Sequence, residues 1–576
     1  MGKKIIIGII ILFSFLLFVL IGQFASGLFL IKTFGFPLSN LSYDTFYNYL
    51  NTYGYHYVIG KELKIATVIA IAIPALPVFI ILFTIFAKKN LMADLYGHAS
   101  FAKVNELERK QLIYKPNAYG KDKKYKYPPV LLGKLKGKYI ADYSQLYTAF
   151  AAAPGGGKGV GFVIPNLLQY PESCVVLDPK LENWEITAGY RSSVLKQKCF
   201  LFSPDANHES GYATHCWNPF DYIDTTPCQM LGSIKLITSI LIPTPNGENQ
   251  SFYISAQNLV NGIISYLMET SGETRNMTRV LEIIRSHEGL ESFIKRTVAE
   301  RDNSDSPLSD NCKGLLLSFA NNANARGRDS TKGIAESYLD VFDDEVVAKA
   351  TSKSDFDFRD LRRKKISIYV GVRPPSMSKF QRLLNLFFSQ CIIVNTQVLP
   401  ENATKDNPLP YQCLLLIDEF PALGPVEIIR ISSGYTRGYN MRYALIFQNR
   451  SQLASKESYG AEGSSALLET MHNQIVLNTD SIKDAEMYSK QIGDVTVRNR
   501  SRSRNIGKGG GGSMSDWQYH KRPLMLPQEI MNLDDKKCLI FKKGVSPIYG
   551  DKIFWYKEDM FKKRGNMPLP NVPSLL

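Results

Sequence analysis

A glycine-rich loop between an apolar strand and an apolar helical segment constrains the fold of this chain more than any other feature. The apolar run 146–151 leads into residues 152–159, Ala-Ala-Pro-Gly-Gly-Gly-Lys-Gly, and then into an apolar segment that continues to Tyr170. In such a loop, backbone N–H groups surround phosphates and the lysine reaches the β- and γ-phosphates. The sequence therefore predicts a P-loop nucleotide site with contacts at Ala153, Pro154, Gly155, Gly156, Gly157, Lys158, Gly159 and Val160.

The loop departs from the pattern G-x-x-x-x-G-K-[ST] at two positions. Ala152 stands where the first glycine is expected, and Gly159 replaces the serine or threonine whose hydroxyl binds Mg²⁺. The sequence therefore leaves open which groups contact the phosphates near Ala152 and which ligand completes the coordination of Mg²⁺.

A second motif follows the apolar run 414–417, which ends in two acids. We expect Asp418 to hold Mg²⁺, directly or through water, and Glu419 to orient the attacking water. Gln448 follows the apolar run 443–447 and could sense the γ-phosphate, whereas Arg437 could reach the nucleotide of a neighbouring subunit. Spacing alone leaves an ordinary polar role open for both residues, and Arg442 is an alternative to Arg437.

Short apolar runs recur along the chain and indicate a parallel sheet. Runs bounded by turns and separated by helical patterns are typical of strands buried on both faces of an α/β sheet. Residues 227–349 interrupt this pattern with helical stretches at 252–269 and 278–296, which predicts an all-α insertion. The strand-length runs are 146–151, 174–177, 199–202, 366–372, 414–417, 443–447 and 474–477.

Two uncharged apolar segments, about 5–31 and 65–87, are long enough to cross a membrane as helices. A cleaved signal peptide is a weaker interpretation of the first segment, because its apolar stretch continues past the candidate cleavage site. Lys3 and Lys4 precede the first span, and Lys88 and Lys89 follow the second. By the positive-inside rule, both termini and the main body are expected in the cytoplasm, with a short periplasmic loop.

The chain carries a formal charge of +15, so a polyanionic partner or an anionic membrane face fits its composition. Lysines concentrate between residues 115 and 138, and arginines with glycines fill residues 498–513, which we expect to form a flexible basic loop. Each basic stretch is either a solvated surface or a contact with lipid or nucleic-acid phosphates.

Several motifs together resemble the TraG-like coupling proteins of type IV secretion, which act in conjugation and effector secretion. The resemblance runs from about residue 95 to 540. It is carried by residues 97–102 (GHASFA), 158–161 (KGVG), 164–167 (IPNL), 177–180 (LDPK), 183–184 (NW), 217–219 (WNP), 418–424 (DEFPALG), 448–453 (QNRSQL) and 522–527 (RPLMLP).

This resemblance implies a RecA-like P-loop domain with an all-α insertion that receives substrates, preceded by two transmembrane helices. It implies an ATP- and Mg²⁺-dependent ATPase of the inner membrane, assembled as a hexamer. The expected partners are inner-membrane lipid, other type IV secretion components, and a relaxase with single-stranded DNA, effector proteins, or both. It also implies that Arg437 is the inter-subunit arginine finger and Gln448 the sensor.

The expected domain order follows from these patterns. We predict a membrane anchor at 1–90, a basic juxtamembrane segment at 91–140, and a tail at 551–576. The nucleotide-binding domain is predicted in two parts, 141–226 and 350–550, on either side of an all-α insertion at 227–349.

Other classes of protein share part of this pattern. A membrane DNA translocase of the FtsK/HerA type has the same two nucleotide motifs but need not carry the 177–180 and 522–527 signatures. A receptor that recruits cargo without hydrolysis would explain Ala152 and Gly159 but not the intact acids Asp418 and Glu419. A membrane-tethered AAA protease is disfavoured because the sequence has no H-E-x-x-H motif.

Overall fold

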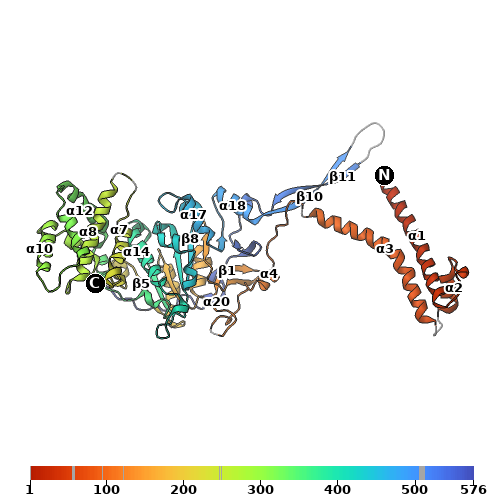
Figure 1. Cartoon of the computed structure of the whole chain (residues 1–576), viewed down its shortest axis with the longest axis horizontal. Coiled ribbons are helices and arrows are strands. Elements are labelled where there is room, and N and C mark those ends of the chain that lie inside the picture. The colour runs from red at the N-terminus through yellow and green to blue at the C-terminus, as the bar shows by residue number, and fades with distance from the viewer. Residues whose placement is uncertain are drawn as a thin grey trace. The chain divides into compact units, whose positions relative to one another are not determined.

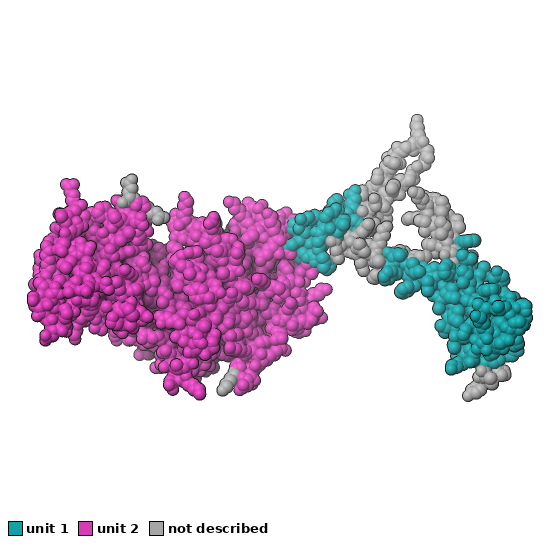
Figure 2. Space-filling view, viewed as in Figure 1, with its two compact units in different colours: residues 1–99, 493–524 teal, residues 100–492, 525–576 magenta. Residues whose placement is uncertain are grey.

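The computed structural model describes residues 2–54, 59–93, 95–120, 122–245, 247, 249–504 and 513–576. The chain forms two compact units, one of residues 1–99 and 493–524 and the other of residues 100–492 and 525–576 (Figure 2). The domain boundaries predicted at 90, 140, 226, 349 and 550 stay predictions, because this division is coarser and groups 493–524 with the N-terminal residues.

The first unit contains two long apolar helices, α1 (Gly2–Thr33) and α3 (Gly60–Ala93), with the short α2 (Thr45–Tyr53) between them. The windows Phe15–Thr33 and Gly60–Ile80 are apolar and long enough to cross a membrane. The two helices approach closely at Gly22, where an added Cβ would lie 3.1 Å from the carbonyl oxygen of Ala70. The structure therefore has two candidate spans within the helices that the sequence predicted.

The first unit also contains an antiparallel hairpin of β10 (Asp494–Arg504) and β11 (Ser513–Pro523). The prediction of a flexible loop over 498–513 is wrong for residues 498–504 and 513, whereas 505–512 lie outside the described residues. Arginine alternates with asparagine or serine from 498 to 504, and a two-residue period is the pattern of a strand. The basic composition obscured this alternation.

The second unit is built around an eleven-stranded sheet with the order β2-β1-β13-β12-β9-β3-β8-β7-β4-β6-β5. All seven predicted runs are strands, and they pair in parallel, which confirms the α/β fold class. These strands are β3 (Thr148–Ala151), β4 (Ser173–Leu177), β5 (Lys198–Phe202), β6 (Ile366–Val370), β7 (Cys413–Asp418), β8 (Met441–Phe447) and β9 (Asn473–Val476).

Four antiparallel strands that the sequence reasoning missed extend the sheet beyond β9. Hairpin β1–β2 turns at Lys136 and Gly137, which both adopt positive φ as a tight two-residue turn requires. Strand β12 pairs antiparallel with β9, and β13 links β12 to β1. The four strands are β1 (Val130–Leu135), β2 (Lys138–Asp142), β12 (Lys537–Lys542) and β13 (Ile548–Asp551).

The regular elements that the structure describes within residues 227–349 are helices joined by loops, without a strand among the described residues, and they form one end of the second unit (Figure 1). The predicted helix 278–296 is two helices, one ending at Ile284 and the other starting at Leu290, and Gly289, at φ +85°, directly precedes the second. The helices are α7 (Pro227–Leu241), α8 (Gln250–Glu269), α9 (Met277–Ile284), α10 (Leu290–Asp302), α11 (Asp310–Ala320), α12 (Ala325–Leu339) and α13 (Glu345–Ala350).

Helices cover both faces of the sheet and enclose two large apolar clusters. One cluster joins one sheet face, through residues such as Val175 and Leu415, to α14 and the all-α region, and the other packs Phe162 and Trp184 against the opposite face. The remaining helices are α4 (Val104–Arg109), α5 (Ile164–Leu167), α6 (Glu182–Ser193), α14 (Met377–Asn395), α15 (Glu427–Ser432), α16 (Arg450–Leu453), α17 (Gly460–Glu469), α18 (Ile482–Ile492), α19 (Pro527–Met531) and α20 (Asp559–Lys562).

Candidate nucleotide site

The predicted chemical groups meet at the carboxyl edge of the parallel strands. The glycine loop follows β3, Asp418 ends β7 with Glu419 directly after it, and Gln448 follows β8. Strands β7, β8 and β3 are direct neighbours in the sheet, so their carboxyl ends lie side by side. In open parallel sheets this edge is where ligands bind.

The glycine loop has backbone geometry that other residues adopt with difficulty. Gly155 and Gly157 have φ of +74° and +85°. A Cβ on Gly156 would lie 2.9 Å from the carbonyl oxygen of Ala153, so the loop closes tightly there. The chain then enters a π-helical turn, Gly159–Val163, that leads into α5. The loop is thus followed by a helix start that faces the same edge.

Lys158 lies against the two acids. Its Nζ is 2.6 Å from Glu419 Oε2 and 4.0 Å from Asp418 Oδ1. The side-chain amide of Gln448 donates to the same Glu419 oxygen at 3.5 Å. Lys158, Asp418, Glu419 and Gln448, which come from three separate segments of the sequence, therefore form one cluster.

Asp418 and Glu419 each have a feature that raises the free energy of the folded chain when it is alone. Asp418 Oδ1 is buried and accepts no hydrogen bond from the part of the chain that the structure describes. Burial raises the pKa of Asp418, an effect that nearby Lys158 opposes. Glu419 adopts φ +94°, a conformation that costs energy in a residue other than glycine. Orphaned polar atoms and backbone strain of this kind gather at functional sites.

Sequence reasoning gave no role to Asp178, which lies beside these acids. It directly follows β4 and is 1% exposed. Asn183 donates to its Oδ1 at 3.0 Å, and the backbone N–H of Trp184 donates to its Oδ2 at 2.8 Å. Burial, aided by the charge of Asp418, raises the pKa of Asp178 to about 7. A signal was present, since Asp178 ends a predicted strand as Asp418 does.

Sequence reasoning also missed two residues on the other side of the loop. The buried Lys552 donates from Nζ to the carbonyl oxygen of Gly156 at 2.9 Å. Asn478 follows β9, and its buried Oδ1 has no hydrogen-bond partner among the described residues. No motif marks Lys552, because its contact depends on the antiparallel strands that bring residues 537–552 next to the loop. Asn478 directly follows the predicted strand run 474–477, so its place after a parallel strand was an available signal.

The structure does not bring Arg437 to this cluster. Arg437 lies in the 3-10 helix Thr436–Tyr439, which precedes β8, with its guanidinium 5.7 Å from the ring centre of Tyr147. Gln448 is at the other end of β8, about 20 Å away for a strand of this length. Arg437 is half-buried at the amino edge of the sheet, so it does not reach the nucleotide loop of its own chain.

Arg442, the alternative candidate for the arginine finger, is in the wrong environment for that role. It is completely buried in β8 and donates to the carbonyl oxygens of Leu146, Pro128 and Asp142 and to the carboxylate of Asp142. A side chain enclosed by its own chain cannot extend into a neighbouring subunit. The alternative is therefore wrong for a physical reason that spacing did not reveal.

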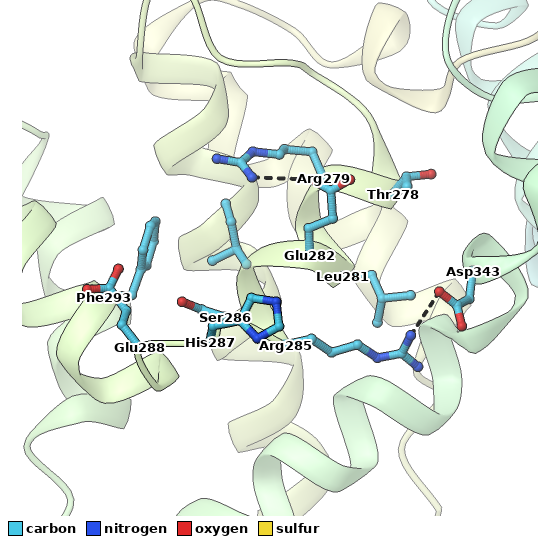
Figure 3. Close-up of a pocket in the computed structure, with 11 residues that line it drawn as sticks. Thr278, Arg279, Leu281, Glu282, Arg285, Ser286, His287, Glu288, Phe293 and Asp343 are labelled. Atoms are coloured by element: carbon cyan, nitrogen blue, oxygen red, sulfur yellow. Dashed lines mark hydrogen bonds and ion pairs between the residues drawn. The ribbon is translucent and has the colours of Figure 1, made fainter.

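A separate hollow of about 680 Å³ lies in the all-α region and has mixed charge (Figure 3). Arg279 is paired with Glu282 at 3.1 Å, and Arg285 is paired with Asp343 at 2.9 Å. His287 also lines the hollow. Because both guanidinium groups have carboxylate partners, this hollow is not an extension of the phosphate site and offers no net basic surface.

Comparison of the sequence with known proteins agrees with this geometry. Residues 100–573 match the family described as type IV secretory system conjugative DNA transfer. A conjugal transfer protein TraG from Escherichia coli is 25% identical over 526 residues, covering 84% of this chain and 80% of that protein. A protein VirD4 from Rhizobium rhizogenes is 28% identical over 449 residues, covering 76% of this chain and 62% of that protein.

Solved structures share the fold. The plasmid coupling protein TrwB, in complex with the ATP analogue ADPNP, aligns with a TM-score of 0.54 at 16% identity, covering 80% of this chain and 94% of that one. TrwB in complex with ADP and Mg²⁺ aligns with a TM-score of 0.53 at 14% identity, covering 83% of this chain and 96% of that one. The likeness confirms the RecA-like sheet. With a family match over most of its length, this chain belongs to the type IV secretory system conjugative DNA transfer family.

Proposed function

We propose that this protein is the coupling ATPase of a type IV secretion system, anchored in the inner membrane. In this role it recruits cargo, a relaxase with single-stranded DNA, effector proteins, or both, and uses ATP hydrolysis to deliver it to the secretion channel. The observation that carries the proposal is the convergence of Lys158, Asp418, Glu419 and Gln448 at the carboxyl edge of the sheet. The nucleotides bound by TrwB support ATP as the ligand.

The residues at this edge also fit Mg²⁺. The buried, unpartnered Asp418 Oδ1 is an oxygen donor of the kind that Mg²⁺ prefers, and it lies beside the phosphate loop. Asp418 would hold the ion directly or through water. When bound, Mg²⁺ neutralises charge that develops on the phosphate oxygens.

The Lys158–Glu419 contact suggests how binding prepares the reaction. Backbone N–H groups within residues 153–160, among which Pro154 has none to offer, surround the phosphates, and Lys158 exchanges Glu419 for the β- and γ-phosphate oxygens. Glu419 is then free to accept a hydrogen bond from water and orient it. The water oxygen bonds to the γ-phosphorus and the water gives up a proton to solvent, while the bond to the β,γ-bridging oxygen breaks and ADP leaves with that oxygen. Gln448 contacts the γ-phosphate in this arrangement.

The membrane and assembly parts of the proposal rest on different support. Lysines flank the two candidate spans, at residues 3, 4, 88 and 89, which favours two crossings with both termini and the main body in the cytoplasm. The position of Arg437 at the amino edge requires a neighbouring subunit if this residue acts on a nucleotide. Both points fit a homo-oligomer, with a hexamer implied by the family resemblance, that contacts other type IV secretion components.

Phosphate release and nucleotide binding, measured separately on the detergent-solubilised chain, test the proposal. We expect Glu419→Gln to lower hydrolysis by about 10²–10⁴-fold while ATP still binds, because the phosphate loop is intact. Lys158→Ala should lose hydrolysis and weaken binding. Glu427→Gln, at an exposed carboxylate paired with Arg430, is the matched control. Parent-level turnover in Glu419→Gln, or no turnover by the parent chain, would contradict the proposal, and the latter would favour a non-hydrolysing receptor.

A further inference from the structure

We propose that Asp178 is a second carboxylate of the Mg²⁺ site and positions the hydrated ion beside Asp418, in place of the P-loop hydroxyl that Gly159 lacks. The inference rests on the proposed function, because it names a further residue of the same nucleotide site. Asp178 is a positioning residue in this account. It acts on the nucleotide through the ion and its waters.

The sheet register places the two carboxylates together. Strands β4 and β7 are parallel neighbours in which Leu177 pairs with Ile417. Asp178 and Asp418 occupy the next aligned position, so their side chains point to the same side of the sheet from strands about 4.8 Å apart. Two acids in adjacent register are expected to repel each other unless a cation lies near both.

Asp178 is held in a fixed orientation. One oxygen accepts from the side-chain amide of Asn183 and the other from the backbone N–H of Trp184, at 3.0 Å and 2.8 Å. Each carboxylate oxygen still has a lone pair for a further donor. Asp178 can therefore accept hydrogen bonds from water on the ion without breaking the contacts that hold it.

The cation paired with Asp418 is the side chain of Lys158, 4.0 Å from Asp418 Oδ1. Binding of ATP draws that ammonium group toward the phosphates. The buried Asp178 and the half-buried Asp418 are then left with less compensation, and the enclosed Asp418 Oδ1 has no hydrogen-bond donor among the residues described here. A hydrated divalent cation would supply positive charge near both carboxylates and a partner for Asp418 Oδ1, since Mg²⁺ keeps several waters that carboxylates can hold.

Gly159 leaves room on the loop side of the ion. A Cβ built at this position meets no atom within 4 Å, so the first side-chain atom of a serine displaces no neighbour. The P-loop hydroxyl is missing because residue 159 is a glycine. Neighbouring atoms do not prevent a larger residue from carrying its Cβ at this position. This gives the inference a direct test by compensation.

The experiment uses the full detergent-solubilised chain with Glu419→Gln as the parent, so that ATP is not consumed. Mn²⁺ is titrated into the ATP complex and followed by electron paramagnetic resonance, and ATP binding is measured in EDTA. We expect Asp178→Asn to weaken Mn²⁺ binding by about 10–100-fold, as loss of partners around a metal does elsewhere. ATP affinity in EDTA should stay unchanged. Asp205→Asn, at a buried carboxylate after β5 paired with Arg373 at 3.0 Å, should change neither quantity.

The compensating variant separates positioning of the ion from a structural role at the start of α6. Adding Gly159→Ser to Asp178→Asn should recover a measurable part of the Mn²⁺ affinity. Unchanged Mn²⁺ affinity in Asp178→Asn, or a loss that Gly159→Ser does not reduce, would overturn the inference while leaving the proposed function intact. If the parent itself binds no Mn²⁺ with ATP, the proposed function fails and the inference fails with it.

Discussion

At the amino edge of the parallel strands, Arg442 is completely buried and its guanidinium donates to three backbone carbonyls and to Asp142. Asp142 also receives hydrogen bonds from Asn473 and Ser144 and lies 3.3 Å from Lys542. At the carboxyl edge, Asp418 Oδ1 and Asn478 Oδ1 are buried without partners among the described residues. The same sheet thus satisfies buried charge at one end and leaves it unsatisfied at the other.

The difference separates charge that holds the fold from charge that acts on a ligand. Burial alone would raise the pKa of Asp142, but Arg442 and Lys542 hold it below its ordinary value. Burial raises the pKa of Asp178 to about 7 and that of Asp418 above its ordinary value. The carboxyl groups at the carboxyl edge lack full compensation by nearby cations, which is a physical reason to expect a ligand there. The charges at the amino edge are already paired, so no ligand is expected at that edge.

Arg437 should affect rate without affecting stability, although it lies at the amino edge. If it completes a neighbour's nucleotide site, Arg437→Ala should lower phosphate release by about 10³–10⁵-fold. Mixing it with Lys158→Ala subunits should restore part of the activity, because some interfaces then pair an intact loop with an intact arginine. Arg430→Ala, at an exposed arginine paired with Glu427, is the control. No rescue at any mixing ratio, despite demonstrated co-assembly, would mean that Arg437 acts within its own chain or only structurally, and its distance from its own nucleotide loop would then favour the structural role.

Arg442 should behave in the opposite way. Arg442→Met leaves Asp142 and three carbonyls without their guanidinium donor, and breaking a buried pair of this kind costs about 3–5 kcal/mol. The free energy of unfolding, measured by denaturant titration, should fall by that amount, and any loss of activity should follow the loss of folded protein. Unchanged stability would remove the contrast between the two edges.

Stability should also depend on pH through Asp178. Its pKa is raised in the folded chain to about 7 from an ordinary value of 3.8, so the folded state binds the proton more tightly. This contribution is complete below about pH 4 and is lost as pH rises to about 7, with a slope of at most about 1.4 kcal/mol per pH unit. Asp178→Asn should flatten this slope in denaturant titrations at pH 5 and pH 7 without nucleotide or Mg²⁺. An equal slope in both proteins would argue that Asp178 stays charged across this range.

Much of this arrangement could be predicted from sequence because the decisive residues follow strands. The seven parallel strands are apolar runs of recognisable length, and Lys158, Asp418, Glu419 and Gln448 each lie just beyond one of them. Parallel strands align their carboxyl ends, so convergence followed from strand order alone.

The missed features depend on contacts between distant segments. The four antiparallel strands, the contact of Lys552 with Gly156, and the enclosure of Arg442 by carbonyls near residues 128, 142 and 146 involve pairings that no local pattern encodes. Asp178 follows a predicted strand, which was a signal in the sequence, but its proximity to Asp418 was not. That proximity depends on β4 and β7 being neighbours in register, which only the folded sheet shows.

The smallest expected effect is a gain in stability at the carboxyl edge. Asp418→Asn replaces a half-buried carboxylate whose enclosed Oδ1 has no hydrogen-bond donor, while the Lys158–Glu419 pair at 2.6 Å is retained. Relieving a charge that Lys158, 4.0 Å away, compensates only in part should raise the free energy of unfolding by about 1 kcal/mol in the absence of nucleotide, although Mg²⁺-dependent hydrolysis is lost. Asp142→Asn is the matched substitution at the amino edge, and there the same chemical change should lower stability, because Arg442 and Lys542 lose their counter-charge. Thermal unfolding of both variants beside the parent decides the matter. If Asp418→Asn were destabilised as much as Asp142→Asn, the carboxyl edge would be as well satisfied as the amino edge, and the unmet charge would no longer mark the nucleotide site.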